Sequence, residues 1–403
     1  MAITKIEVPE LFDFGSDNSA FKLPTGTTAE RPTSPSNGEM RFNTTTGYVE
    51  YYDTTDTQWW EIDYAPSFAS KNFNSVLYTG NSGTQAITGV GFQPDLVWIK
   101  ARDFSYNHRL FDSVRNLNGR LESNTTAAEV TNTINDNFVS FDSNGFTLGA
   151  TSSTNGSNDN NKSYVAWNWK AGGTAVSNTD GTMTSLVSAN QAAGFSIVQQ
   201  TSNNSNDTIG HGLSAAPELI ISKNQSISGP WGVYNASNGV NGYLYFNEAD
   251  AHASAANVYP IVNSTVFSGG SGGWNNGTGN VYINYCFHSV AGYSKIGSYT
   301  WTGTSYTAGT MVTNLGFEPS FVMIKGINLT SNWQMYDNKR VSGTQSYALY
   351  ADLSDAEVTT GYQGIGFDSD GFSAIVGADG NTTASSSLNQ SGETYIYMAF
   401  AAT

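Results

Sequence analysis

The stretch GFQPDLVWIK at residues 91–100 returns as GFEPSFVMIK at residues 316–325, and a weaker copy, PELIISK, lies between them at residues 217–223. In each copy a proline leads an apolar run that closes on a lysine six positions later. A short run rich in Val, Ile and aromatic residues, entered through a turn, predicts a buried β-strand. Proline has no N–H for the interior of a sheet, so we expect each strand to begin at its proline.

The repeat continues beyond this strand. Asp112, Asn235 and Asp337 each lie 18 positions after the proline of their copy, and each follows an aromatic residue. Every copy also closes on an alternating segment with large apolar residues at every second position, at 164–169, 282–287 and 395–400. Such alternation places the large side chains on one face of a strand. The sequence therefore predicts three copies of one β unit.

Composition agrees with this prediction. Glycine, Asn, Ser and Thr are abundant, and no long segment has helical periodicity. We expect an all-β protein with three tandem β-sandwich repeats of jelly-roll or lectin-like type. The first, second and third repeats are placed at 72–173, 194–292 and 293–403, with a polar insert at 174–193. The residues expected in their cores are Leu96, Trp98, Trp167, Trp169, Ile221, Phe287, Met323 and Phe400.

Residues 1–66 are expected to form a separate segment. It begins with a short apolar tag around Phe12 and Phe14 and continues into a turn-rich arm. Three short strands are expected at 39–43, 48–52 and 59–62. A lone three-stranded meander is only marginally stable, and this one carries more aromatic surface than a small unit can bury. We predict an attachment and oligomerisation segment whose contacts include Phe12, Phe14, Trp59 and Trp60.

Charge excludes several partners. The chain has 33 acidic against 17 basic residues, a net charge of −16, and no basic run. Such a chain repels nucleic acid and is not steered to anionic membranes. The N-terminus lacks a signal-peptide core, and no stretch has the length of a membrane span. We therefore expect synthesis in a cytoplasm, no nucleic acid and no membrane insertion. The single cysteine, Cys286, is expected to be a small packed residue.

Catalytic and metal-binding patterns are not found in the sequence. The histidines have no metal-ligand spacing, and P-loop, GxSxG, HExxH and CxxC motifs are missing. We expect neither a metal nor another cofactor, and no enzymatic activity. Lys100 with Asp112, and Lys325 with Asp337, are expected to be structural cross-strand pairs. A glycosidase would need two nearby carboxylates. The candidates considered for that pair, Glu122, Glu129, Asp142, Glu357 and Asp368, are better explained as structural residues.

Long Asn/Ser/Gly-rich loops precede the last strand of each repeat, at 151–163, 269–280 and 377–392. Equivalent loops of a sandwich emerge at equivalent ends, where they can vary without disturbing the core. Their composition is typical of adaptable binding loops. We predict a receptor-binding surface that includes Trp274, Asn275, Asn276 and Tyr395. A Trp274 that packs on its own domain or on a neighbouring subunit is the structural alternative.

Several of these motifs resemble known proteins. The segments GTTAERP at 26–32 and NGEMRFN at 37–43, with residues 51–60, resemble an N-terminal segment of fibre and other structural proteins of tailed bacteriophages. Segments of the third repeat are similar to a repeat of marine phage virion proteins: GYSKIGSYT at 292–300, VMIK at 322–325, YDNKR at 336–340 and TYIYMAF at 394–400. The second repeat departs most from this pattern.

The resemblance implies a virion protein, and a tail fibre that contacts the host is the expected function. A homotrimer joined through residues 1–66 is expected, because symmetry lets each meander find a partner. The other expected partners are further virion proteins and a host surface glycan or protein receptor. A capsid-decorating or head-fibre protein is the first alternative, and a polysaccharide-degrading tailspike is the second. The sequence does not separate tail from capsid location.

Overall fold

The computed structural model describes most of the chain. The described residues are 23–46, 48–61, 68–115, 117, 119–131, 138–151, 156–203, 207–270, 274–305, 307–342, 345–358, 364–375 and 388–402. They form an all-β protein whose helices are single turns, so the predicted fold class is confirmed. Within these residues no helix is long and apolar enough to cross a membrane. The chain divides into two compact units, Met1–Pro66 and Ser67–Thr403.

The N-terminal unit is a small sheet in the order β1-β2-β3-β4. Its elements are β1 (Thr25–Gly26), η1 (Thr28–Glu30), β2 (Met40–Asn43), β3 (Tyr48–Asp53) and β4 (Gln58–Glu61). Strands β2 to β4 form the predicted antiparallel meander, and β1 adds a parallel edge. The fully buried Glu50 lies on one face of the sheet, where Arg31 reaches it at 2.5 Å and Arg41 at 3.4 Å.

The first repeat is a two-sheet sandwich. Sheet β5-β11-β7-β8 packs against sheet β6-β10-β9 over an apolar cluster that draws residues from both. The elements are η2 (Ala69–Lys71), β5 (Phe73–Thr79), β6 (Gln85–Thr88), β7 (Leu96–Ala101), β8 (Arg109–Asp112), β9 (Phe138–Asp142), β10 (Gly145–Leu148) and β11 (Ser163–Trp169).

The second repeat has a larger sheet, β12-β13-β14-β21-β16-β17-β18-β19, and a small sheet, β15-β20. Its elements are β12 (Val176–Asn178), β13 (Ser185–Asn190), β14 (Phe195–Thr201), β15 (Thr208–Gly210), β16 (Leu219–Asn224), β17 (Gly232–Asn235), η3 (Ala236–Asn238), β18 (Gly242–Tyr245), β19 (Ala253–Ser254), β20 (Val266–Ser268) and β21 (Val281–Phe287). The insert expected as a polar connection forms β12 and β13, because Met183 and Val187 are buried in the apolar cluster of this repeat.

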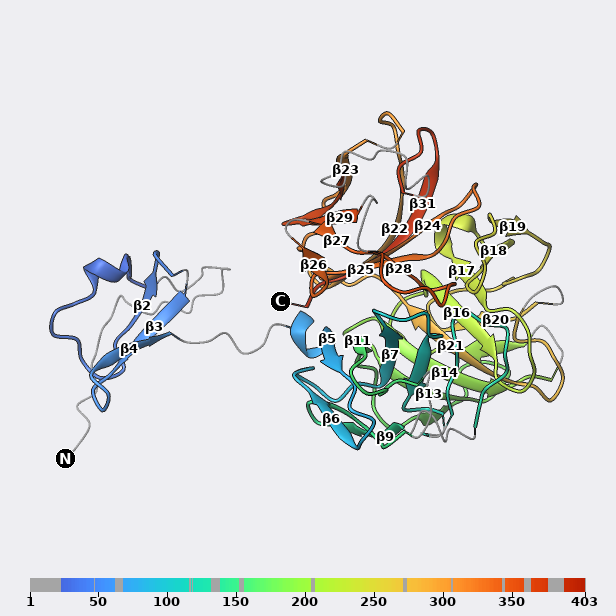
Figure 1. The fold of residues 1–403 in the computed structure, drawn as a ribbon, viewed down its shortest axis with the longest axis horizontal. Coiled ribbons are helices and arrows are strands. Elements are labelled where there is room, and N and C mark those ends of the chain that lie inside the picture. The colour runs from blue at the N-terminus through green and yellow to red at the C-terminus, as the bar shows by residue number, and fades with distance from the viewer. Residues whose placement is uncertain are drawn as a thin grey trace. The chain divides into compact units, whose positions relative to one another are not determined.

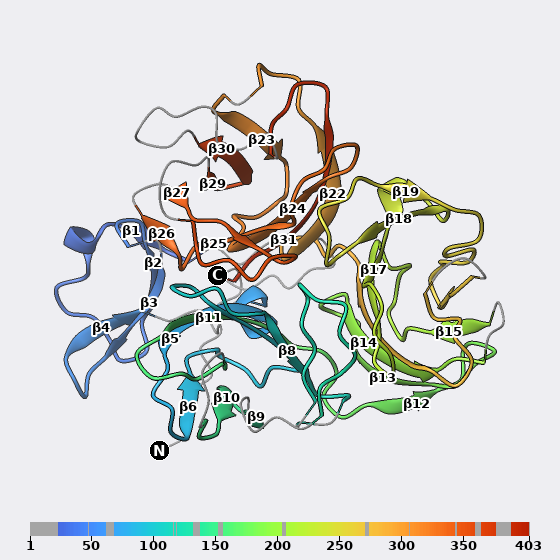
Figure 2. The same ribbon diagram turned by 45° about the vertical axis from the view of Figure 1, so that its right-hand side comes forward.

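The third repeat has two five-stranded sheets, β22-β31-β24-β25-β28 and β23-β30-β29-β27-β26. Its elements are β22 (Ser294–Thr300), β23 (Gly309–Thr313), β24 (Phe321–Gly326), β25 (Gln334–Asp337), β26 (Val341–Ser342), β27 (Gln345–Ser346), β28 (Leu349–Tyr350), β29 (Gly364–Asp368), β30 (Gly371–Ile375) and β31 (Thr394–Phe400). Figures 1 and 2 show the strands of the three repeats, coloured blue to green, green to yellow and orange to red, as three groups around a common centre.

The repeated stretch forms the buried strands β7, β16 and β24, as predicted. Each strand begins two residues after its proline rather than at the proline itself. Register is kept in all three, because the first residue of each strand pairs with the residue 18 positions after the proline: Leu96 with Asp112, Leu219 with Asn235 and Phe321 with Asp337. The pairing pattern of the first copy is thus preserved in the other two.

The large face of each closing strand packs outside its own sandwich. In β11, Val165, Trp167 and Trp169 belong to an apolar cluster that all three repeats share, whereas Tyr164 and Ala166 belong to the first repeat's own cluster. The eight predicted core residues are all buried, and all eight lie in the shared cluster. The expectation of a separate core for each repeat is therefore wrong for these residues. They join the three repeats into one unit.

Candidate functional site

Hydrogen bonds from one histidine and two tryptophan side chains link the three repeats into a closed ring. The residue 14 positions after each proline is His108, Trp231 or Trp333. Trp231 Nε1 donates to Glu122 O at 3.0 Å, and Trp333 Nε1 donates to Tyr245 O at 2.8 Å. His108 Nε2 lies 2.8 Å from Tyr350 O. Because Trp98 Nε1 donates to His108 Nδ1, the Nε2 atom carries the proton of this neutral ring. The second repeat thus contacts the first, the third contacts the second, and the first contacts the third.

Buried ion pairs lie at two of these contacts between repeats, which we call joints. Arg115 lies 2.6 Å from Asp112 and 2.7 Å from Glu129. In the third repeat Arg340 lies 2.6 Å from Asp337 and 2.9 Å from Glu357. A neighbouring repeat completes each cluster, because Tyr285 donates to Asp112 and Trp167 donates to Asp337, both at 2.8 Å. The second repeat has the neutral Asn235 at this position, and its side chain caps the N–H of Ser237.

The predicted lysine pairs are wrong. Lys100 Nζ donates to the carbonyls of Ala101 and Phe104, and Lys325 Nζ donates to those of Ala249 and Gly326. The aspartates expected as their partners instead bind arginine three residues later along the chain. Arginine is the partner of each aspartate because its planar guanidinium can bind a carboxylate and a backbone carbonyl at the same time. Each lysine therefore satisfies carbonyl groups near the C-terminal end of its own strand.

The carboxylates considered for sugar cleavage are all engaged. Glu122 binds Arg109 at 2.8 Å and Arg120 at 3.2 Å, and Glu129 and Glu357 bind the joint arginines. Asp142 accepts from Ser140 and Thr147, and Asp368 accepts from Ser373 on the next strand of its hairpin. Among the described residues, no group of three or more His, Cys, Asp or Glu side chains could hold a metal ion. These carboxylates therefore have structural partners.

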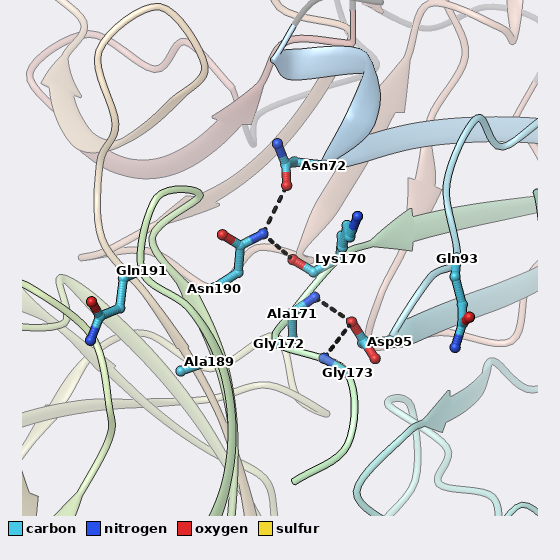
Figure 3. Close-up of a pocket in the computed structure, with 10 residues that line it drawn as sticks. All are labelled: Asn72, Gln93, Asp95, Lys170, Ala171, Gly172, Gly173, Ala189, Asn190 and Gln191. Atoms are coloured by element: carbon cyan, nitrogen blue, oxygen red, sulfur yellow. Dashed lines mark hydrogen bonds between the residues drawn. The ribbon is translucent and has the colours of Figure 1, made fainter. Parts of the chain in front are cut away.

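A hollow of about 700 Å³ lies beside Asp95 (Figure 3). Asp95 Oδ2 accepts from the N–H groups of Ala171 and Gly173, and Asn190 Nδ2 donates to Asn72 Oδ1. Burial raises the pKa of Asp95, whose Oδ1 has no hydrogen-bond partner. The residue directly after the proline has the same role in the other repeats. Glu218 accepts the N–H of Ser289, and Ser320 accepts the N–H of Ala402, each two residues after the closing strand. Asp95 is therefore a structural cap.

Two of the predicted receptor-binding residues are buried. The ring of Tyr395 is fully buried and stacks on Tyr299 at 5.0 Å, so it offers no face to a ligand. Its hydroxyl accepts the N–H five residues earlier, as do the hydroxyls of Tyr164 and Tyr282 in the other repeats. Asn275 is also buried, and its amide group accepts from Gln200 and donates to Ser222. These two residues hold their loops in place.

Trp274 lies beside a second hollow, of about 270 Å³, in the second repeat. Its half-buried ring contacts Tyr243 and Tyr245 edge-to-face, with centroids 5.4 and 5.7 Å apart, and its Nε1 donates to Pro230 O at 3.0 Å. Asn276 donates to Gly270 O, which fixes the loop next to this ring. Burial, with the neighbouring Tyr243 hydroxyl, raises the pKa of Tyr245 to about 12, so its hydroxyl remains protonated. The residues that line the hollow are Asn224, Ile227, Ser228, Gly229, Pro230, Tyr243, Tyr245, Trp274 and Tyr282.

The sequence analysis missed Gly232, which makes room for Trp274. A Cβ atom at Gly232 would lie 2.0 Å from Cδ2 of the indole, so the ring rests flat on the bare backbone of β17. The same register position holds Arg109 in the first repeat and Gln334 in the third. The signal was present in the sequence, because a glycine replaces a long polar side chain in the second repeat alone among the three.

Trp59 and Trp60 of the N-terminal unit lie on opposite faces of β4. Trp59 packs on Tyr52 at 5.5 Å, whereas Trp60 is 42% exposed. Trp60 pairs with Tyr51, which pairs with Met40, and all three side chains are exposed. We name these three side chains the apolar stripe. Phe12 and Phe14 lie outside the described residues.

Comparisons with known proteins place most of the chain in one family. Neither a curated protein nor a solved structure matches the chain. Residues 68–403 match a family described as a domain of unknown function, DUF7483. The match spans the large unit that contains the ring of repeats and the hollow beside Trp274. The chain therefore belongs to the DUF7483 family.

Proposed function

We propose that the chain is a virion surface protein, and specifically a tail fibre of a tailed bacteriophage that contacts the host cell. The observation that carries the proposal is the hollow beside Trp274, where the indole, on a loop fixed by Asn275 and Asn276, meets two tyrosine rings of β18. An aromatic hollow with a few polar groups on a rigid support is typical of binding sites. The sequence resemblance to phage fibre segments supplies the biological setting.

The N-terminal unit is the attachment and oligomerisation segment in this proposal. Its apolar stripe of Met40, Tyr51 and Trp60 is the support, because exposed apolar faces rimmed by polar residues mark protein interfaces. The same unit from other copies of the chain covers the stripe in a homotrimer, and the remainder of the segment binds other virion proteins. Three copies on one fibre would also raise the avidity of a weak receptor site.

The receptor is a neutral glycan or a protein on the host surface. A chain with a net charge of −16 gains nothing from electrostatic steering toward an anionic surface. The protein performs no catalysis and uses no cofactor in this proposal, which is supported by the structural partners of Glu122, Glu129 and Glu357.

Sedimentation of the full chain tests the assembly. We expect the native chain to sediment as a trimer, and a Tyr51→Ser, Trp60→Ser double variant to sediment as a monomer with unchanged far-ultraviolet circular dichroism. A double variant that keeps the native mass would contradict the role of the apolar stripe.

Electron microscopy of virions labelled with gold-conjugated antibodies against residues 67–403 tests the location. The proposal predicts gold at the distal ends of tail fibres. Gold on the head would replace the tail fibre with a capsid-decorating or head-fibre protein, and virions without gold would end the virion proposal. Release of oligosaccharides from host polysaccharide by the purified chain would instead identify a tailspike.

A further inference from the structure

The hollow beside Trp274 is formed by residues of the second repeat. The loop between β16 and β17 supplies Ile227 and Pro230, strand β18 supplies Tyr243 and Tyr245, and Trp274 comes from the loop before β21. Ile227 is 52% exposed at its rim. In the first repeat the positions of Gly232, Tyr243 and Tyr245 hold Arg109, Arg120 and Glu122, and both arginines form ion pairs with the glutamate. The second repeat thus has an aromatic surface where the first has a charge cluster.

The aromatic wall is held in place before any ligand arrives. Trp274 rests with one face on Gly232, so the surface it contributes to the hollow comes from its other face and its edges. Its Nε1 is bound to Pro230 O, and the next residue, Asn275, is anchored by Gln200 and Ser222. A wall that needs no rearrangement loses little entropy on binding.

The chemistry of the lining selects the ligand. The nine lining residues, all of them described, are uncharged. An anionic ligand would find no cation there, and the net charge of −16 would repel it. Recognition of a quaternary ammonium uses a cage of several ring faces, each within about 6 Å of the ion. The three rings here contact one another at 5.4–5.7 Å, which leaves no gap between them for such an ion.

Size and polarity narrow the choice further. A hollow of about 270 Å³ lies just below the range of about 300–1,000 Å³ that is usual for pockets of drug-sized ligands. It therefore suits a single small ring better than an extended peptide. The Asn224 amide oxygen accepts the N–H groups of Ser226 and Ile227, so its NH2 group is the one that can donate to a ligand. The exposed Ser228 adds a hydroxyl at the rim.

We propose that this hollow binds one neutral pyranose residue of a surface glycan. The C–H face of the sugar lies on the ring of Trp274, whose electron-rich face attracts C–H groups, and its hydroxyls bind Asn224 and Ser228. The inference rests on the proposed host contact and specifies its chemistry. A site of this size binds weakly on its own, with a dissociation constant on the order of 1 mM.

Saturation-transfer NMR on the full chain tests the site. The probes are methyl glycosides of glucose, mannose and galactose, with the methyl glycoside of N-acetylneuraminic acid as an anionic probe and a proline-rich peptide as an alternative occupant. The test variant is Ile227→Arg, which places a long charged side chain at the rim of the hollow. The matched control is Val176→Arg, because Val176 is a 65% exposed residue of β12, outside the lining.

We expect transfer to ring protons of at least one neutral glycoside in the native chain and in Val176→Arg, and at least tenfold weaker binding in Ile227→Arg. No transfer from any neutral glycoside would overturn the proposal. Equal binding by Ile227→Arg, or binding of the peptide or the anionic glycoside alone, would overturn it as well.

Adsorption of virions that carry the same two variants separates this inference from the proposed function. If Ile227→Arg abolishes glycoside binding and leaves adsorption unchanged, the saccharide site stands and the host-contact role fails. If Ile227→Arg lowers adsorption while the native chain binds no glycoside, the host-contact role stands and the saccharide inference fails.

Discussion

The first and third repeats hold their joints with buried charge, whereas the second uses neutral side chains. Arg115 and Arg340 each bind two carboxylates, and a neighbouring repeat donates a further hydrogen bond to each cluster. Their counterpart in the second repeat is Asn238, next to the cap made by Asn235. The ring of repeats therefore tolerates a neutral joint, and the repeat with that joint also carries the aromatic hollow.

The largest expected difference lies in the joint arginines. Arg340→Ala would leave the buried Asp337 without its cation and Glu357 with Arg102 alone, and breaking a buried pair in this way costs about 3–5 kcal/mol of unfolding free energy. Asn238→Ala, the matched change in the second repeat, removes a neutral group whose Nδ2 has no hydrogen-bond partner. We expect it to cost less than about 1 kcal/mol. Urea unfolding of both variants measures the difference, and equal losses of unfolding free energy would show that the charged joint is no more important than the neutral one.

A second difference concerns Gly232, the glycine beneath the indole of Trp274. Gly232→Ala would place Cβ 2.0 Å from the indole of Trp274, so the ring must move, at a cost of about 1–3 kcal/mol for overpacking. Gly83→Ala in the first repeat is the control, because a Cβ there comes no closer than 3.5 Å to the Asn81 side chain and Gly83 lies outside the lining of the hollow. Thermal unfolding and glycoside binding should both weaken in Gly232→Ala alone. If both variants behave like the native chain, Trp274 is not held by β17.

The smallest expected effect concerns the buried lysines. Burial lowers the pKa of Lys100 to about 7 and that of Lys223 to about 8. Above these values the unfolded chain keeps a proton that the folded chain has lost, so the lysine contribution to stability rises with pH until the unfolded pKa is reached. The slope is at most about 1.4 kcal/mol per pH unit for one lysine.

Variants at the two lysines separate their pH windows. The unfolding free energy should rise less steeply between pH 7 and pH 9 in Lys100→Met than in the native chain. In Lys223→Met the difference should begin about one pH unit higher. Stability curves that run parallel to the native curve in both variants would show that these lysines keep their protons in the folded chain.

The sequence predicted the strands well because their signals are local. The threefold register located β7, β16 and β24, and alternation located β11, β21 and β31. Alternation states that one face of a strand is buried, but it does not state what covers that face. The common core of Trp167, Phe287 and Phe400 therefore had no signal in any single repeat. The joints were equally hidden, since Trp231 and Trp333 bind backbone carbonyls, which every residue has.

The candidate site was predicted in part. Trp274 was found through its loop, but Tyr395 was a wrong choice, because its register position holds a tyrosine in all three repeats and each hydroxyl holds its own loop. A residue that all repeats share is better explained by the common fold. Gly232, Tyr243 and Trp274 differ from their counterparts, and such differences between repeats are the better guide to a site.

In the proposed function the second repeat contacts the host. Ile227 and Phe104 lie ten residues after the prolines of the second and first repeats, and both are exposed. The direct measurement is competition, in which purified full-length chain blocks adsorption of virions to host cells. We expect the Phe104→Arg chain to compete like the native chain and the Ile227→Arg chain to need at least tenfold higher concentration. Equal competition by the two variants would contradict it.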